Sequence, residues 1–368
     1  MNDRSPLLDS ATIEVGVGRS GAAGAFDAGA GAAIQALTSI GCLEISVVIV
    51  YASATHDLKE ALRGIHSVVG DAPTIGTTTA GEIETGSHQH NIVVVILASP
   101  YLSVRYAVGH RVSTDWQAAV QAVLDAPELA RALPEDLARH EYQTREGIAQ
   151  FAMLFSPGST QRASSTNYEI LEAIKARTLG RIPIVGGASA DDWQMQTNYV
   201  LSGQEAHADS MLLAIFETQL QFGIALTHGF SAASEVATVT AVEGHEVVSL
   251  DGLPAVDVLS RILGTTRKAL AKKHITLTTG RAIGTADPMG QFSINVASYA
   301  TRRGGVRFTQ PLTAGARLVL MEPEPKTMAS AGPDALRKAM LRGAIREPAI
   351  ALVHHCALRL HIAPEHPK

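Results

Sequence analysis

Two stretches of small, hydroxyl-bearing and acidic residues carry the strongest chemical signal in this sequence. The first runs from Gly76 to Glu82 as Gly-Thr-Thr-Thr-Ala-Gly-Glu, and the second from Gly186 to Asp192 as Gly-Gly-Ala-Ser-Ala-Asp-Asp. Small side chains let a ligand approach the backbone, whose amides can hold an anionic group together with the hydroxyls. The carboxylates can hold a cationic group. This mixture predicts loops at strand ends that bind a zwitterion such as an amino acid; the alternative is tight turns with packing roles.

The candidate ligand-binding residues combine both stretches with one later histidine. They are Gly76, Thr77, Thr78, Thr79, Gly81, Glu82, Gly186, Gly187, Ser189, Asp191, Asp192 and His228. His110 is considered with them because it ends a strand of the first half. No catalytic residue and no metal ligand is assigned.

A glycine pattern near the N-terminus offers a different chemistry. Gly16, Gly18 and Gly21 have the GxGxxG spacing of a dinucleotide-binding turn, after an expected strand at Thr12–Val17. That fingerprint also needs an acidic residue at the end of the second strand, and Asp57 comes late for it. The sequence therefore disfavours a nicotinamide site.

Nucleophile and metal patterns are weak. Cys356 follows an expected strand at Ala349–Val353, where a small buried hydrophobe is the alternative to a reactive thiol. His88 and His90 would share a strand face, but a third ligand at a sensible spacing is missing. We expect a protein that is not an enzyme. The alternative is an enzyme of unrecognised type that uses Cys356 or facing carboxylates of Glu82 and Asp192.

The elements that must position the two stretches occur twice. Each stretch follows a buried strand and a helix, and further strands come after it. In the first half the elements are Val47–Ala52, Asp57–Val69, Ile92–Ala98 and Leu102–Val108. In the second half they are Phe151–Phe155, a helix opened by a capping box at Thr166–Glu169, a strand around Tyr199, Met211–Phe216 and Phe222–Leu226.

The two halves align residue by residue. Gly76 corresponds to Gly186, Thr79 to Ser189, Glu82 to Asp192 and His110 to His228. This predicts an α+β (mixed α/β) fold in which duplicated β-α-β-β-β units, at about residues 47–110 and 151–228, form an N-terminal lobe.

A second, smaller mixed α/β domain is expected over residues 236–368, after a first domain over residues 1–235. Thr238–Val242 and Val247–Leu250 predict a hairpin, and a helix begins near Pro254 and stops at Gly264. Further strands are expected at Ile275–Thr279, Phe292–Tyr299, Val306–Thr309 and Leu318–Met321, with a helix at Asp334–Arg342.

Composition limits the partners. The 368 residues carry a net charge of −5, which argues against nucleic-acid binding because such surfaces need a clustered positive excess. Two distant cysteines, Cys42 and Cys356, fit a reducing compartment. The N-terminus does not resemble a signal peptide, and the longest apolar runs have strand length. We therefore expect a cytoplasmic protein without membrane segments.

Several phrases resemble the FIST family. Tyr51–Leu58, Ile75–Ile83, Ile184–Asp192 and the sequence His228-Gly-Phe are similar to its N-terminal domain. Leu250–Leu259 and Cys356–Arg359 are similar to its C-terminal domain. The sequence departs from the family at His354-His355-Cys, where members more often carry apolar and small residues.

The resemblance implies a sensory protein that binds a small ligand, with amino acids among the candidates, and passes the signal to a separate partner. Some members are haem-containing nitric-oxide sensors that act on histidine kinases. The alternative function is therefore a haem b sensor with His228 as axial ligand. We place the ligand pocket between the two halves of the N-terminal lobe, where ligand binding would close the halves.

Overall fold

The computed structural model describes residues 12–83, 87–88, 90–133, 149–160, 165–271, 275–286 and 292–362. The chain divides into two compact units. The first contains Met1–Ile224 and Ala339–His354, and the second contains Ala225–Lys338 and His355–Lys368. A segment near the C-terminus therefore belongs to the first unit.

The first unit contains two large sheets. One has the strand order β1-β6-β2-β3-β10-β11, and the other has the order β7-β12-β8-β9. The strands of the first sheet are β1 (Glu14–Ser20), β2 (Ile45–Ser53), β3 (Thr74–Thr79), β6 (Ile92–Ala98), β10 (Tyr199–Ser202) and β11 (Glu205–Ala208). Those of the second are β7 (Leu102–His110), β8 (Ala149–Pro157), β9 (Ile184–Ser189) and β12 (Ser210–Thr218). A short hairpin pairs β4 (Glu82–Ile83) with β5 (Ser87–His88).

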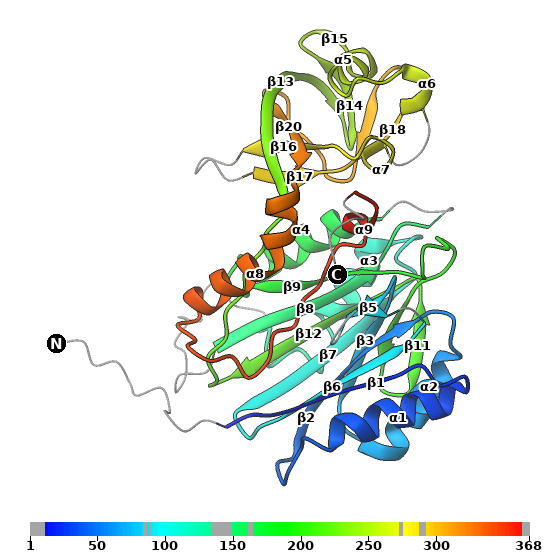
Figure 1. Ribbon diagram of the computed structural model, residues 1–368, viewed down its shortest axis with the longest axis vertical. Coiled ribbons are helices and arrows are strands. Elements are labelled where there is room, and N and C mark those ends of the chain that lie inside the picture. The colour runs from blue at the N-terminus through cyan, green and yellow to red at the C-terminus, as the bar shows by residue number, and fades with distance from the viewer. Residues whose placement is uncertain are drawn as a thin grey trace, which may run out of the picture. The chain divides into compact units, whose positions relative to one another are not determined.

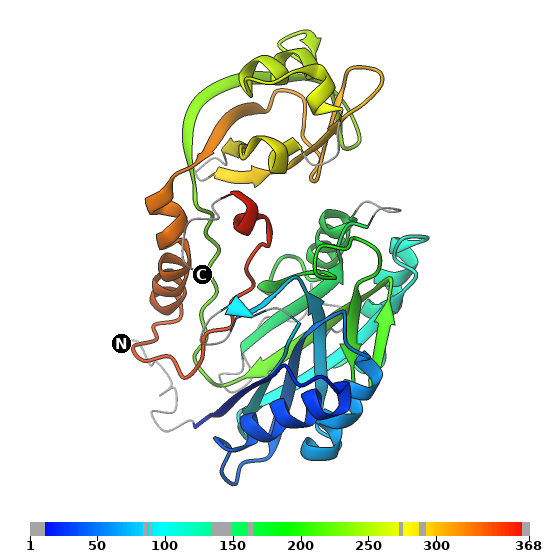
Figure 2. The same cartoon turned by 45° about the vertical axis from the view of Figure 1, so that its right-hand side comes forward.

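Four helices cover the sheets and complete four layers (Figures 1 and 2). Apolar residues of α1 (Ala25–Leu37) and α2 (Leu58–Val69) share a core with β2 and β6. Those of α3 (Trp116–Leu124) and α4 (Asn167–Arg177) share a core with β8 and β12. Between the sheets lies a third core, which includes Ile49, Met153 and Phe155. Strands buried on both faces explain the unbroken apolar runs of β2 and β6.

The structure places the glycines of the GxGxxG pattern in a strand. Gly16 and Gly18 lie inside β1, which pairs antiparallel with β6. A Cβ on Gly16 would lie only 1.9 Å from the Ala36 carbonyl oxygen of α1. These glycines let a helix approach the sheet, and the interpretation as a dinucleotide-binding turn is wrong.

The α+β class is confirmed, but the repeat is shifted relative to the prediction. β1-α1-β2-α2-β3-β6 and β7-α3-β8-α4-β9-β12 follow the same order, and their strands have the same neighbours in the two sheets. β7 therefore begins the second repeat rather than ending the first. The expected strand Phe222–Leu226 is absent, so the predicted equivalence of His110 and His228 is wrong. Both errors arise because the predicted units began at β2 and β8 and so left out the first strand and the first helix of each repeat.

Other local predictions had mixed outcomes. The helix at α2 is confirmed, and the Asp57 side chain accepts a hydrogen bond from Glu60 N–H at its start. Helix α4 begins after Thr166 as expected, but that side chain makes no capping hydrogen bond. The sequence also predicts a charged helical link over Asp115–Gly147. Helix α3 lies in its first part, and its residues 134–147 lie outside the described part of the chain.

The second unit is built on one further sheet with the order β17-β16-β20-β13-β14-β19-β18, and β15 pairs with β14. Its strands are β13 (Phe230–Glu243), β14 (Glu246–Leu250), β15 (Leu253–Pro254), β16 (Ala282–Ala286), β17 (Phe292–Asn295), β18 (Ala297–Ala300), β19 (Val306–Phe308) and β20 (Arg317–Pro323). Its helices are α5 (Ala255–Ile262), α6 (Arg267–Leu270), α7 (Ile275–Thr279), α9 (Leu358–Ile362) and most of α8 (Pro325–Arg342).

The predicted hairpin is confirmed as β13 and β14. Two predicted strands are wrong. Ile275–Thr279 forms helix α7, and Ala349–Val353 pairs with no strand among the described residues. Ile275–Thr279 is too short for β-branched composition alone to distinguish a strand from a helical turn.

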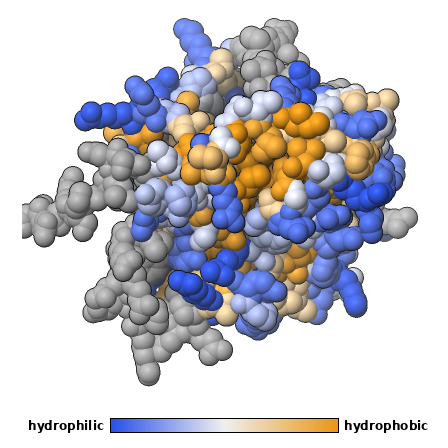
Figure 3. Space-filling model, turned by 90° about the horizontal axis from the view of Figure 1, so that it is seen from below, coloured by the Kyte–Doolittle hydropathy of each residue, from blue (hydrophilic) through white to orange (hydrophobic). Residues whose placement is uncertain are grey.

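Apolar residues gather on the lower face of the first unit, where α1 and α2 lie (Figure 3). Among the side chains of helix α1, Phe26 and Ile34 are exposed. In the described part of the chain, no helix is both long and apolar enough to cross a membrane.

Candidate functional site

The two predicted stretches begin as strands rather than loops. Gly76–Thr79 lies in β3, and Gly186–Ser189 lies in β9. Each strand runs parallel to its repeat's central strand, β2 or β8, in the same register. Gly76 pairs with Val50 and Gly186 with Leu154, so the predicted equivalence of the two glycines is confirmed. Alternating threonines suit a strand, which explains why these residues are not a turn.

The structure brings the two stretches into direct contact. The Thr77 hydroxyl lies 2.7 Å from the Ser189 hydroxyl, and both side chains are buried. Beyond the strand ends, Ala190 N–H donates to the Thr78 carbonyl at 2.9 Å, and Asp192 N–H donates to the Thr79 carbonyl at 3.2 Å. The Thr78 hydroxyl accepts from Tyr199 N–H at 2.9 Å. Repeat-related strand ends therefore meet at one place.

Two carboxylates and two hydroxyls gather there, in a group that we call the carboxylate cluster: Ser53, Thr79, Glu82 and Asp192. Ser53 donates to Asp192 Oδ2 at 2.7 Å, and Thr79 donates to Glu82 Oε1. Asn91 N–H donates to Glu82 Oε2 at 3.2 Å. Glu82 is 2 % exposed. Ser53 is the one member that the sequence did not single out.

The two carboxylates interact electrostatically. Burial raises the pKa of Glu82, whereas its hydrogen bonds from Thr79 and Asn91 lower it, and the negative charge of Asp192 raises it further. In the part of the chain that the structure describes, neither carboxylate has an ion-pair partner. A cation arriving here would relieve repulsion between two like charges.

Asp191 has a different role from its neighbour. Its two carboxylate oxygens accept hydrogen bonds from the backbone N–H groups of Met195, Gln196 and Thr197, at 2.6 to 2.9 Å. These bonds hold the turn that follows the cluster. Asp191 thus shapes the loop that follows the cluster.

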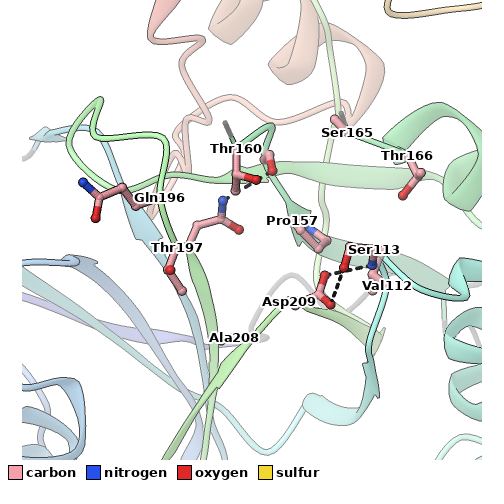
Figure 4. Close-up of a pocket in the computed structure, with 12 residues that line it drawn as sticks. Val112, Ser113, Pro157, Thr160, Ser165, Thr166, Gln196, Thr197, Ala208 and Asp209 are labelled. Carbon is pink, nitrogen blue, oxygen red and sulfur yellow. Dashed lines mark hydrogen bonds between the residues drawn. The ribbon is translucent and has the colours of Figure 1, made fainter. Parts of the chain in front are cut away.

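A pocket of about 190 Å³ lies next to that loop (Figure 4). Its lining is rich in hydroxyl and amide groups, and its one carboxylate, Asp209, is bonded to Ser113. The lining residues are Val112, Ser113, Pro157, Gly158, Thr160, Ser165, Thr166, Gln196, Thr197, Asn198, Ala208 and Asp209. None of the predicted ligand-binding residues lines it. The pocket instead shares the loop that Asp191 holds.

The two histidine candidates lie elsewhere. His110 bonds to Ser210 at 3.0 Å, and its ring lies 5.2 Å from that of His207. His228 belongs to the second unit. Its Nδ1 accepts from Phe230 N–H at 3.3 Å, and its Nε2 lies 3.2 Å from the Phe292 carbonyl oxygen. Because both ring nitrogens are used, the residues present do not fit haem iron at His228.

Sequence reasoning missed an aromatic group beside the carboxylate cluster. Tyr51 and Phe155 occupy equivalent positions of β2 and β8, and their rings meet edge to face at 6.1 Å. His354 contacts both rings, and its Nε2 lies 2.9 Å from the Tyr51 hydroxyl oxygen. Burial lowers the pKa of His354 to about 4 and raises that of Tyr51. The only signal in the sequence was the departure from the family at His354.

The remaining chemistry is limited. Cys356 lies just before α9 rather than at a strand end, and it is exposed, so the alternative of a small buried hydrophobe is wrong. Desolvation by the surrounding protein raises the pKa of its thiol, which disfavours a thiolate nucleophile. No group of three or more metal-ligating side chains forms among the described residues. The His88 side chain of the expected His88–His90 pair lies outside them.

The fold and site define a duplicated α-β-β-α domain with a polar cluster at its repeat-related strand ends. The FIST N domain model matches residues 46–253, more than half of the chain, and the protein belongs to this family. FIST N domains are small-ligand sensory domains of signal-transduction proteins. This confirms the resemblance for the N-terminal domain.

Individual relatives are distant. An uncharacterized protein of Methanocaldococcus jannaschii, MJ1623, is 28% identical over 173 aligned residues, and the match covers 44% of this chain and 34% of that protein. The chain thus spans about a third of this curated relative. Cyanuric acid hydrolase from A. caulinodans matches 57% of this chain and 72% of its own, with 11% identity and a TM-score of 0.31. A second cyanuric acid hydrolase structure gives a TM-score of 0.33 and 11% identity, over 56% of this chain and 70% of its own.

Proposed function

We propose that this protein is a sensor whose ligand is a small molecule with an ammonium group, such as an amino acid, bound at the carboxylate cluster. The observation that carries the proposal is the convergence of Glu82 and Asp192, from equivalent positions of the two repeats, without a cationic partner among the residues that the structure describes. An ammonium group bonded to Asp192 would neutralise this repulsion. Hydroxyls of Ser53 and Thr79 already orient the two carboxylates.

The repeats supply the mechanism of response. Because Asp192 of the second repeat is bonded to Ser53 of the first, a ligand on that carboxylate competes for a contact between the sheets. Ligand binding would then change how the two strand ends meet. A sensor requires such a difference in affinity between two states. We propose that a separate partner, such as a histidine kinase, reads this change in the cytoplasm.

Two further proposals follow from the sequence. We propose that the chain beyond residue 253 corresponds to the FIST C-terminal domain, which the phrases at Leu250–Leu259 and Cys356–Arg359 resemble. We also propose that the protein has no enzymatic activity, which the raised pKa of the Cys356 thiol supports.

Replacing Asp192 by asparagine is expected to weaken binding of the cognate ammonium ligand at least tenfold, since the charge is lost while the shape is kept. The ligand is sought first by thermal-shift screening against amino acids and simple amines. Isothermal titration calorimetry then compares the wild type with Asp192→Asn. Asp71→Asn is the matched control, because Asp71 is exposed in the turn before β3.

A flat thermal-shift response across the panel would contradict the proposed ligand class. Equal affinities of the wild type and Asp192→Asn for a ligand that does bind would place the site elsewhere.

A further inference from the structure

A stretch of chain near the C-terminus, residues 346–354, lies along the first unit without forming a helix or a strand. We call it the C-terminal strap; it is part of the orange-red trace in Figures 1 and 2. Ile350, Leu352 and His354 are partly buried, whereas Ala349, Ala351 and Val353 are exposed. This alternation is that of an extended chain, which is why the sequence suggested a strand.

The strap is held by side chains alone. No backbone hydrogen bond involves residues 346–354, all of which the structure describes. Ile350 and Leu352 pack on the core between the sheets, and His354 bonds to the Tyr51 hydroxyl. A segment without ladder hydrogen bonds can leave a sheet at a small cost, so the strap is among the least firmly held parts of the unit.

The His354 side chain lies in a space that fits a flat ring. We call this space the ring seat; it is formed by Tyr51, Phe155 and Gly187. Tyr51 and Phe155 flank the imidazole, with ring centroids at 5.8 and 5.7 Å. On β9, a Cβ on Gly187 would lie 3.9 Å from the His354 Cβ, so the glycine leaves room for the strap. A polar atom, the Tyr51 hydroxyl oxygen, lies 2.9 Å from a ring nitrogen. The seat therefore combines aromatic edges with one hydrogen-bonding group.

The imidazole does not satisfy its own hydrogen bonds in this seat. Its Nδ1 is buried and has no hydrogen-bond partner within the described ranges of the chain. If Tyr51 donates to Nε2, a proton on Nδ1 is left without an acceptor; if Nε2 donates, the lone pair of Nδ1 is left without a donor. Either tautomer leaves a buried polar atom unpaired, which weakens the hold of the strap.

The seat adjoins the carboxylate cluster. Tyr51 and Ser53 are two residues apart on β2 and face the same side, as do Gly187 and Ser189 on β9. Two residues of a strand span about 7 Å. The ring seat and the Asp192 carboxylate, which is bonded to Ser53, thus lie within the reach of one small molecule.

We propose that His354 is an internal occupant of the ligand site, and that a ligand carrying both an ammonium group and a planar aromatic or heteroaromatic ring displaces it. This inference rests on the proposed function, whose ligand class it narrows. The ammonium group binds Asp192, and the ring replaces the imidazole between Tyr51 and Phe155. The strap is then released. Because the chain passes from His354 of the first unit to His355 of the second, release of the strap loosens one of the three points at which the chain passes between the units.

Strap release can be measured by limited trypsin digestion of the full chain, since Arg346 lies in the strap and is exposed. Cleavage after Arg346 is followed by mass spectrometry. Arg303 of the second unit, whose side chain is 86% exposed, gives an internal reference. His354→Ala is expected to raise the rate of cleavage after Arg346 at least tenfold relative to Arg303. An unchanged ratio of cleavage after Arg346 to cleavage after Arg303 would show that the His354 side chain does not hold the strap in place.

Three probes separate the parts of the ligand: imidazole has the ring, propylamine has the ammonium group, and histamine has both. In the wild type, histamine is expected to accelerate cleavage after Arg346 at a concentration at least tenfold lower than imidazole, with propylamine ineffective. In Asp192→Asn, histamine should act only as well as imidazole. No acceleration by histamine or imidazole would overturn the ring seat.

The outcomes distinguish the two proposals. Suppose that imidazole and His354→Ala release the strap, but that histamine has no advantage that depends on Asp192. The displacement of His354 by a ring is then supported, and binding of an ammonium group at Asp192 is refuted. If amines bind in an Asp192-dependent manner but no ring compound changes the cleavage ratio, the proposed function is supported and the displacement of His354 is refuted.

Discussion

Gly186→Ala is expected to destabilise the first unit by about 3 to 5 kcal/mol, through steric clash and backbone strain together. Gly186 has φ +142°, a conformation that residues with a Cβ rarely adopt. A Cβ at this position would lie 1.9 Å from the Leu154 carbonyl oxygen on the neighbouring strand. Because β9 is an edge strand paired only with β8, the clash would separate it and carry Ser189 and Asp192 away from their partners.

Gly187→Ala provides a matched control one residue further on. Its φ is ordinary, and the nearest atom to an added Cβ is that of His354 at 3.9 Å. This variant is expected to change stability by less than about 1 kcal/mol. Urea unfolding followed by circular dichroism measures both. Similar midpoints for Gly186→Ala and the wild type would show that β9 tolerates the change and that the site is less constrained than described.

Lowering the pH from 7 to 4 is expected to remove up to about 3 kcal/mol of stability through His354 alone. Its pKa is about 4 in the folded protein, against 6.5 ordinarily. Between these values an unfolded or released strap binds a proton that the seated imidazole does not. The contribution is therefore fully present above pH 6.5, falls as the pH drops, and is lost below pH 4.

His354→Gln isolates this effect, because glutamine keeps a polar side chain but does not titrate in this range. The wild type is expected to lose thermal stability faster than His354→Gln between pH 6.5 and 4. An NMR titration of the imidazole carbon-bound protons gives the pKa directly. A value near 6.5 for His354, or parallel loss of stability in both proteins, would mean that the ring is hydrated and the seat is open.

Much of the first unit could be predicted from local pattern. The apolar runs of β2 and β6 and the amphipathic face of α2 specify elements that tertiary contacts then reinforce. The equivalence of Gly76 and Gly186 also followed from the sequence, because it reflects chain order. The frame of the repeat did not follow from the sequence, because the predicted units began at β2 and β8. They left out α1, whose alanine and glycine content gives only a weak amphipathic signal.

The site was predicted in part. Glu82 and Asp192 were paired from their equivalent positions, and the structure brings them together. The contributions of Tyr51, Ser53 and His354 could not be predicted, because they depend on the packing of one sheet against the other and on a strap from far along the chain. His354 also follows a segment whose sequence suggested a strand. The backbone of that segment forms no strand pair with any residue that the structure describes.

The hairpin of β10 and β11 has a consequence for how such a domain can arise and be divided. The hairpin lies in the sequence of the second repeat, but β10 pairs with β3 of the first, with Leu201 opposite Gly76. A fragment that ends after β6 would expose β3 as a bare sheet edge, free to recruit strands from other molecules. Neither repeat is therefore a self-sufficient module, because a hairpin from the second repeat completes the sheet of the first.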